Sequence, residues 1–94
     1  MTAPLSEEEV RRCREDTPGA ASRVHLNNAG AALPPRPVLE AVLGHIRREA
    51  ELGGYEAADL MEERIAAVYG DVAALLGCRA ENVALVENAT VGFS

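Results

Sequence analysis

The sequence contains no lysine and no tryptophan, and its nine basic residues are all arginine. Without lysine, no side chain can form a Schiff base with a carbonyl compound, so any reaction that depends on such an adduct needs a residue from elsewhere. Aromatic residues make up only 3% of the chain. Because Ala, Val and Leu each bury little area, we expect a thin core and at best marginal stability for the isolated chain.

Cysteines and long apolar runs are also scarce. Cys13 and Cys78 have neither CxxC nor Cys/His ligand spacing, so we predict reduced thiols of a cytoplasmic protein and no metal site, with a catalytic thiol as the alternative. We expect no signal peptide and no membrane span. The net charge of −6 argues against nucleic acid or an anionic membrane as partner. We interpret this charge as a solvated surface rather than an acidic docking face.

Helical patterns dominate the chain. The run from Ser6 to Glu9 is a capping box and predicts a short helix to about residue 14. Apolar residues at helical spacing predict two long helices over 36–51 and 56–76, separated by Gly53-Gly54. Gly70 lies inside the second of these helices, where glycine costs about 1 kcal/mol relative to alanine.

Two short apolar runs, 24–27 and 83–87, predict strands. The predicted fold class is therefore an α+β fragment, mostly helical with two short strands that need not pair with each other. We divide the chain into an N-terminal helix and loop over residues 1–22 and one segment over 23–94.

The first candidate site is Asn88-Ala89-Thr90, which follows the second predicted strand. A strand-to-helix turn of small residues presents backbone N–H groups to a phosphate, and a threonine hydroxyl adds another donor. The alternative is a simple Asn or Thr helix cap.

The second candidate is the turn Asn28-Ala29-Gly30, which is preceded by another asparagine, Asn27. Asparagine amides suit a carboxylate or a similar polar group, and Gly30 permits a positive φ or a close ligand approach. The alternative is a β-turn with asparagine as the turn former. His45 is interpreted as a packing residue rather than a catalytic one.

Three motifs, in this order, resemble the start of a pyridoxal-phosphate enzyme of the class V aminotransferase and cysteine desulfurase family, which has fold type I. VHLNNAGAALPPRPVLEAV is similar to the family's opening strand, Asn-Ala-Gly turn and first long helix. GGYEAA is similar to the branch that contains isopenicillin N epimerase-like enzymes and ergothioneine C–S lyases. ENVALVENATVGF resembles the strand and turn that hold the cofactor phosphate. The resemblance covers residues 23–94 and implies an N-terminal segment of an α/β transferase.

Carried over to this chain, the resemblance implies that Ala89 and Thr90 donate to the phosphate of pyridoxal 5'-phosphate, with Asn88 adjacent. It implies that Asn28, Ala29 and Gly30 lie near the carboxylate of an amino-acid substrate. Transamination, epimerisation and C–S lysis would be distinguished by residues outside these 94. The resemblance also implies a homodimer for the complete enzyme.

The chain departs from the family because it contains no Schiff-base lysine, and we expect it to be inactive alone. One hypothesis is a fragment or split half completed by a complementary C-terminal polypeptide. A second is a non-catalytic regulatory module that pairs with a full-length homologue. A third is an unrelated helical interaction domain, in which the turn motifs are coincidental.

Overall fold

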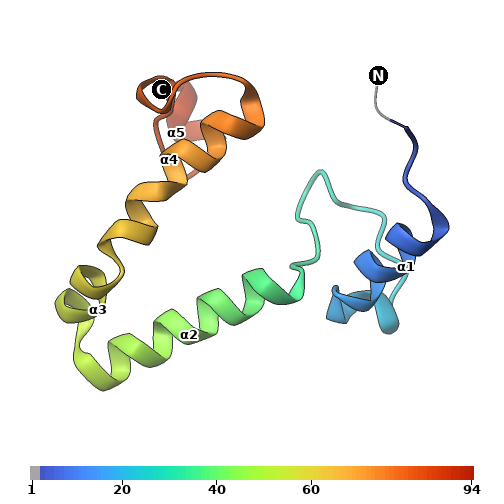
Figure 1. The fold of residues 1–94 in the computed structure, drawn as a ribbon, viewed down its shortest axis with the longest axis horizontal. Coiled ribbons are helices and arrows are strands. Elements are labelled where there is room, and N and C mark those ends of the chain that lie inside the picture. The colour runs from blue at the N-terminus through green and yellow to red at the C-terminus, as the bar shows by residue number, and fades with distance from the viewer. Residues whose placement is uncertain (1–2) are drawn as a thin grey trace. The chain divides into compact units, whose positions relative to one another are not determined.

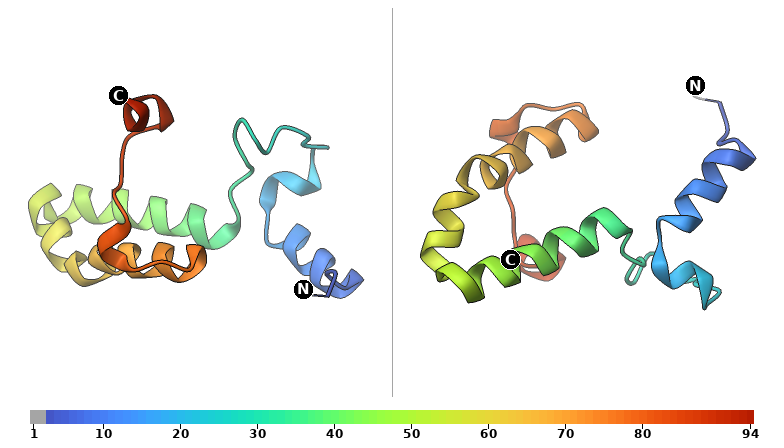
Figure 2. Two further views of the ribbon diagram at one scale, coloured as in Figure 1. Left: turned by 90° about the horizontal axis from the view of Figure 1, so that it is seen from above. Right: turned by 60° about the horizontal axis from the view of Figure 1, so that its bottom comes forward.

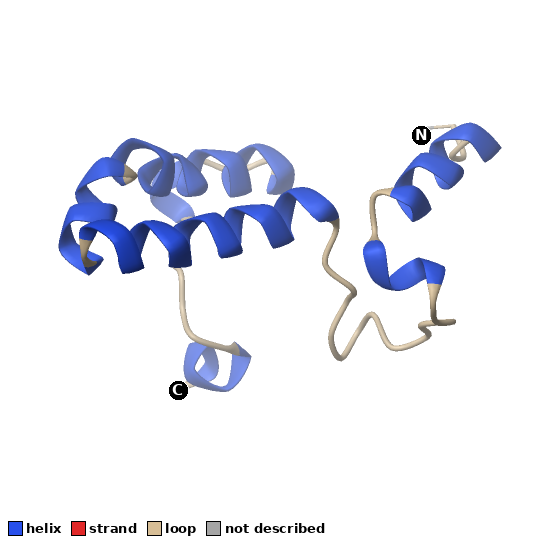
Figure 3. Ribbon diagram, turned by 90° about the horizontal axis from the view of Figure 1, so that it is seen from below, coloured by secondary structure: helices blue, strands red, loops and turns tan. Residues whose placement is uncertain are grey.

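The computed structural model describes residues 3–94, and these residues form helices and loops only (Figures 1 and 3). The chain divides between Glu51 and Leu52 into two compact units. The elements in chain order are α1 (Glu7–Glu15), η1 (Pro18–Ala21), α2 (Arg36–Leu52), α3 (Gly54–Leu60), α4 (Glu62–Leu76), η2 (Ala80–Asn82) and α5 (Ala89–Phe93).

The predicted α+β fold class is wrong, because residues 3–94 contain no strand. The two runs predicted as strands, 24–27 and 83–87, are irregular. A strand exists only through hydrogen bonds to a neighbouring strand, and these runs belong to different units, with no strand for either to pair with among residues 3–94. Apolar residues in the first run are therefore left in solvent, with Val24 88% and Leu26 90% exposed.

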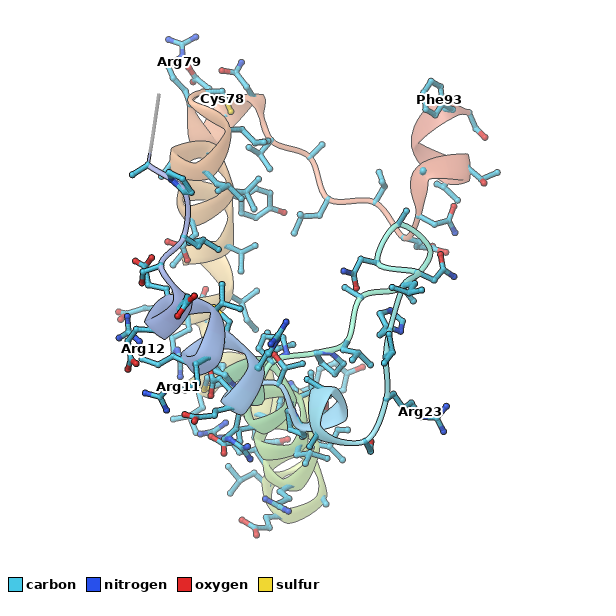
Figure 4. The ribbon with its side chains drawn as sticks, turned by 90° about the vertical axis from the view of Figure 1, so that its right-hand side faces the viewer. Arg11, Arg12, Arg23, Cys78, Arg79 and Phe93 are labelled. Atoms are coloured by element: carbon cyan, nitrogen blue, oxygen red, sulfur yellow. The ribbon has the colours of Figure 1, made fainter. Side chains whose placement is uncertain are left out.

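The capping box predicted at the start of α1 is confirmed. The Glu9 N–H donates to Ser6 Oγ at 3.1 Å, and the Ser6 N–H donates to Glu9 Oε2 at 2.7 Å. Each bond satisfies a backbone donor that the first turn of a helix leaves without a partner. Arg11, labelled in Figure 4, adds ion pairs to Glu8 and Glu15 on the exposed surface of α1.

The helix predicted over 36–51 is formed as α2, and the predicted break follows at Gly53, whose φ of 100° favours glycine. The helix predicted over 56–76 is formed in two pieces, α3 and α4, divided at Met61. The φ of −100° and ψ of 8° at Met61 leave the helical region. Met61 is hydrogen-bonded to both pieces, since its N–H donates to Ala57 O at 3.1 Å and its carbonyl accepts the Ile65 N–H at 2.9 Å. Nothing in the sequence at Met61 explains the break.

The core is very small, as the low aromatic content predicts. Among the described residues, only Ala57 on α3 and Ala73 on α4 are buried hydrophobic residues. Large apolar side chains are instead exposed along both long helices: Val38, Val42, Leu43 and Ile46 on α2, and Ile65, Val68, Tyr69, Leu75 and Leu76 on α4. Each unit therefore carries apolar surface that its own residues do not cover.

Candidate functional site

The turn before α5 is built by Asn88. Its backbone is extended (φ −166°, ψ 171°), and its side-chain Oδ1 accepts the Val91 N–H at 2.9 Å. The Asn88 carbonyl accepts the Gly92 N–H at 3.1 Å, which completes the first turn of α5. The helix cap that the sequence allowed at either Asn or Thr therefore belongs to Asn88, and Thr90 lies inside the first turn.

This cap leaves two backbone donors unused. Within residues 3–94, no group accepts a hydrogen bond from the N–H of Ala89 or of Thr90. The Thr90 hydroxyl also has no partner among these residues, while the Thr90 carbonyl accepts from Ser94 Oγ at 3.0 Å. Two amides and one hydroxyl on consecutive residues suit an anion such as a phosphate, which takes several donors at once. The carboxylate of Glu87, directly before Asn88, opposes an anion there.

The other candidate turn is held by Asn27. Its carbonyl accepts the Ala31 N–H at 3.0 Å, and its side-chain Oδ1 accepts the Gly30 N–H at 3.2 Å. Asn27 thus forms a turn, but the backbone bond closes it over four residues, as in an α-turn, and not over the three of a β-turn. The positive φ proposed for Gly30 is wrong, because the only described glycines with positive φ are Gly53 and Gly77. A Cβ at position 30 would instead lie 2.6 Å from Asn27 Nδ2, so a side chain of this chain occupies the space that glycine leaves.

Sequence reasoning missed the role of His25. Its ring Nε2 lies 2.8 Å from the carbonyl oxygen of Ala31 and donates to it in the tautomer that is protonated on Nε2. This contact spans the turn at residues 27–31 and is local in sequence. No sequence motif predicts this contact. On α2, His45 Nε2 lies 3.2 Å from Glu49 Oε1, one helical turn further along.

An open groove of about 880 Å³ lies beside the turn at residues 27–31. Its lining is mainly apolar and includes Leu5, Val10, Val24, Leu26, Ala32 and Leu33, with Arg14, His25 and Asn28 among its polar members. Arg23 also borders the groove, but its side chain points away from α1 (Figure 4). The groove therefore lacks a converging pair of cations for a substrate carboxylate.

The candidate residues do not all belong to one unit. Asn28, Ala29 and Gly30 lie in the first unit, whereas Asn88, Ala89 and Thr90 lie in the second. Across residues 3–94, no three His, Cys, Asp or Glu side chains gather as a metal-ion site, and Cys13 and Cys78 are free and exposed. No helix in that range is both long and apolar enough to cross a membrane.

Comparison with known proteins gives no match: no family model, no curated protein and no solved structure is similar to this chain. The resemblance to class V aminotransferases thus rests on the three quoted motifs alone.

Proposed function

We propose that this chain is the segment of a class V aminotransferase-like enzyme that holds the phosphate of pyridoxal 5'-phosphate, and that a lysine-bearing polypeptide completes the site. One observation carries the proposal: the Ala89 and Thr90 amides are unused donors on a turn fixed by the Asn88 cap. The ordered motifs support the same assignment. The cofactor, when bound, acts as the electron sink for breaking a bond at the substrate carbon.

In this proposal, the chain binds the cofactor phosphate and orients the cofactor. The amides of Ala89 and Thr90 and the Thr90 hydroxyl donate to the phosphate, while Asn88 keeps the turn in place. The turn from Asn28 to Gly30 faces the amino-acid substrate. Because the chain has no lysine, it is not catalytic alone, and the covalent link to the cofactor comes from the completing polypeptide.

A second candidate function is a non-catalytic helical module that pairs with a full-length homologue. Exposed large apolar side chains on α2, and separately on α4, favour it, since exposed apolar patches are typical of interaction surfaces. The two functions differ in their response to the cofactor. Only the first requires the turn at Asn88 to recognise a phosphate.

Titration with pyridoxal phosphate, and with pyridoxal as the ligand without the phosphate, separates them. In amide-resolved NMR spectra, pyridoxal phosphate should shift the Ala89 and Thr90 signals, and pyridoxal should leave them in place. Borohydride reduction should trap no adduct at a side chain, because no lysine is present. If neither ligand moves these signals, or both move them equally, the cofactor proposal fails and the interaction module remains.

A further inference from the structure

The open groove of the first unit has the size and the apolar surface of a small-molecule site. Residues 5–20 supply part of its lining, and residues 23–33, the loop between η1 and α2 (Figure 2), supply the rest. Its volume of about 880 Å³ falls within the range of roughly 300–1,000 Å³ that such sites have. Leu5, Val24 and Leu26 line it and are exposed to solvent. An apolar ligand would remove this surface from water, which favours binding.

The charged side chains of the groove are all basic. Arg14 and Arg23 line it together with His25, and among the described residues no Asp or Glu does. This distribution is the reverse of that in the whole chain, which has 15 acidic residues and nine arginines. The lining therefore complements an anionic group and not a cationic one.

Arg14 is available to bind such an anion. The nearby carboxylates of Glu8 and Glu15 both pair with Arg11, at the exposed surface of α1. Within residues 3–94, Arg14 itself forms no ion pair. A guanidinium without a carboxylate partner can donate to the anionic group of a ligand, and such a charge-assisted hydrogen bond is stronger than one between neutral groups.

The other polar side chains of the groove favour an alkyl chain over a peptide as the apolar part of the ligand. Thr17 Oγ1 already donates to Cys13 O at 2.8 Å, and His25 Nε2 lies 2.8 Å from Ala31 O. Each residue of a bound peptide would bring an N–H and a C=O that need hydrogen-bond partners, whereas an alkyl chain brings neither. A lining with few free polar side chains is thus better matched to an alkyl chain.

We propose that this groove binds a free fatty acid, with the alkyl chain along the apolar lining and the carboxylate at Arg14. One carboxylate matches one arginine, so this ligand does not need the converging pair of cations that the groove lacks. The site goes beyond the proposed function, because it does not involve the turn at Asn88 and needs no lysine-bearing partner.

Octanoate, hexanoate and 1-octanol are the probes, titrated into the full chain and followed in amide-resolved NMR spectra. Octanoate should shift the signals of residues that line the groove. It should bind about three- to tenfold more tightly than hexanoate, because two more CH₂ groups leave water. It should bind about fivefold more tightly than 1-octanol, which has no charge for Arg14.

Arg14→Gln should weaken octanoate binding by about fivefold and leave 1-octanol binding unchanged. Arg12→Gln is the matched control, since it removes the same charge from α1 at a residue outside the lining, and it should change octanoate binding by less than about twofold. Leu26→Ser alters an exposed side chain of the groove and should weaken octanoate and 1-octanol alike, by about threefold or more. Circular dichroism should give the same helix content for all three variants.

Three results would overturn the proposal. The first is an octanoate titration that leaves the signals of the groove in place. The second is equal weakening by Arg14→Gln and Arg12→Gln, because net charge and not the groove would then be responsible. The third is tighter binding of a short capped peptide of one glutamate and two leucines than of octanoate, since the groove would then recognise a peptide.

Discussion

The backbone N–H of Arg36 donates to the carbonyl of Asp16 at 2.6 Å and so joins the end of α1 to the start of α2. The Arg36 side chain adds a bond from Nη2 to the Glu15 carbonyl at 3.3 Å and lies with Nε 3.9 Å from Asp16 Oδ1. Both side chains of the ion pair are about half exposed, at 49% and 52%. Solvent therefore screens the ion pair, and the backbone bond is the stronger link.

Two substitutions at Arg36 separate these contributions. Arg36→Ala removes the side chain and should lower the free energy of unfolding by no more than about 1 kcal/mol. Arg36→Pro also removes the N–H, at the first residue of a helix where proline is tolerated, and should cost about 1 kcal/mol more. Urea unfolding followed by circular dichroism measures both. Equal effects of the two variants would show that the backbone bond contributes nothing.

Gly70 and Gly77 form a second contrast. A Cβ at either position meets no atom within 4 Å, but Gly77 has a φ of 72° and Gly70 lies in the helical interior of α4. Gly70→Ala should therefore stabilise α4 by up to about 1 kcal/mol, and Gly77→Ala should destabilise its C-terminus by about 1 kcal/mol. Thermal unfolding of both variants is the measurement. A loss of stability in Gly70→Ala would mean that this face of α4 is covered.

The Asn88 cap predicts a local effect. Asn88→Ala removes the acceptor of the Val91 N–H and should cost about 1 kcal/mol at α5, while Asn88→Asp keeps an acceptor and should cost much less. Amide hydrogen exchange at Val91 and Gly92 reports the fraying of this helix. Exchange that is equally fast in the parent and in Asn88→Ala would contradict the cap.

Features that depend on neighbouring residues were predictable from the sequence. The capping box is local because Ser6 and Glu9 are only three residues apart. The break at Gly53 is local because it depends on the positive φ of that one residue. The apolar spacing of residues 36–51 similarly predicts α2, although the element extends to Leu52.

Features that depend on distant or competing partners were not predictable. The apolar runs at 24–27 and 83–87 have the composition of strands, but composition supplies no neighbour with which to pair. Asn88 and Thr90 are both residue types that cap helices. The sequence does not show which of them has the extended backbone of a cap, and in the structure it is Asn88. The backbone hydrogen bond from Arg36 to Asp16 closes a long loop, and no sequence pattern at either residue predicts it.

The central claim, that the turn at Asn88 holds a phosphate, is tested most directly by titrating pyridoxal phosphate into Thr90→Ala and Thr90→Ser. A hydrogen bond to a charged group contributes about 1.5–3 kcal/mol, so Thr90→Ala should weaken binding by about ten- to a hundredfold. Thr90→Ser keeps the hydroxyl and should retain most of the affinity. Because Asn88 and not Thr90 caps α5, neither variant should change the stability of the chain without the cofactor. Equal affinities for the parent and both variants would contradict the claim.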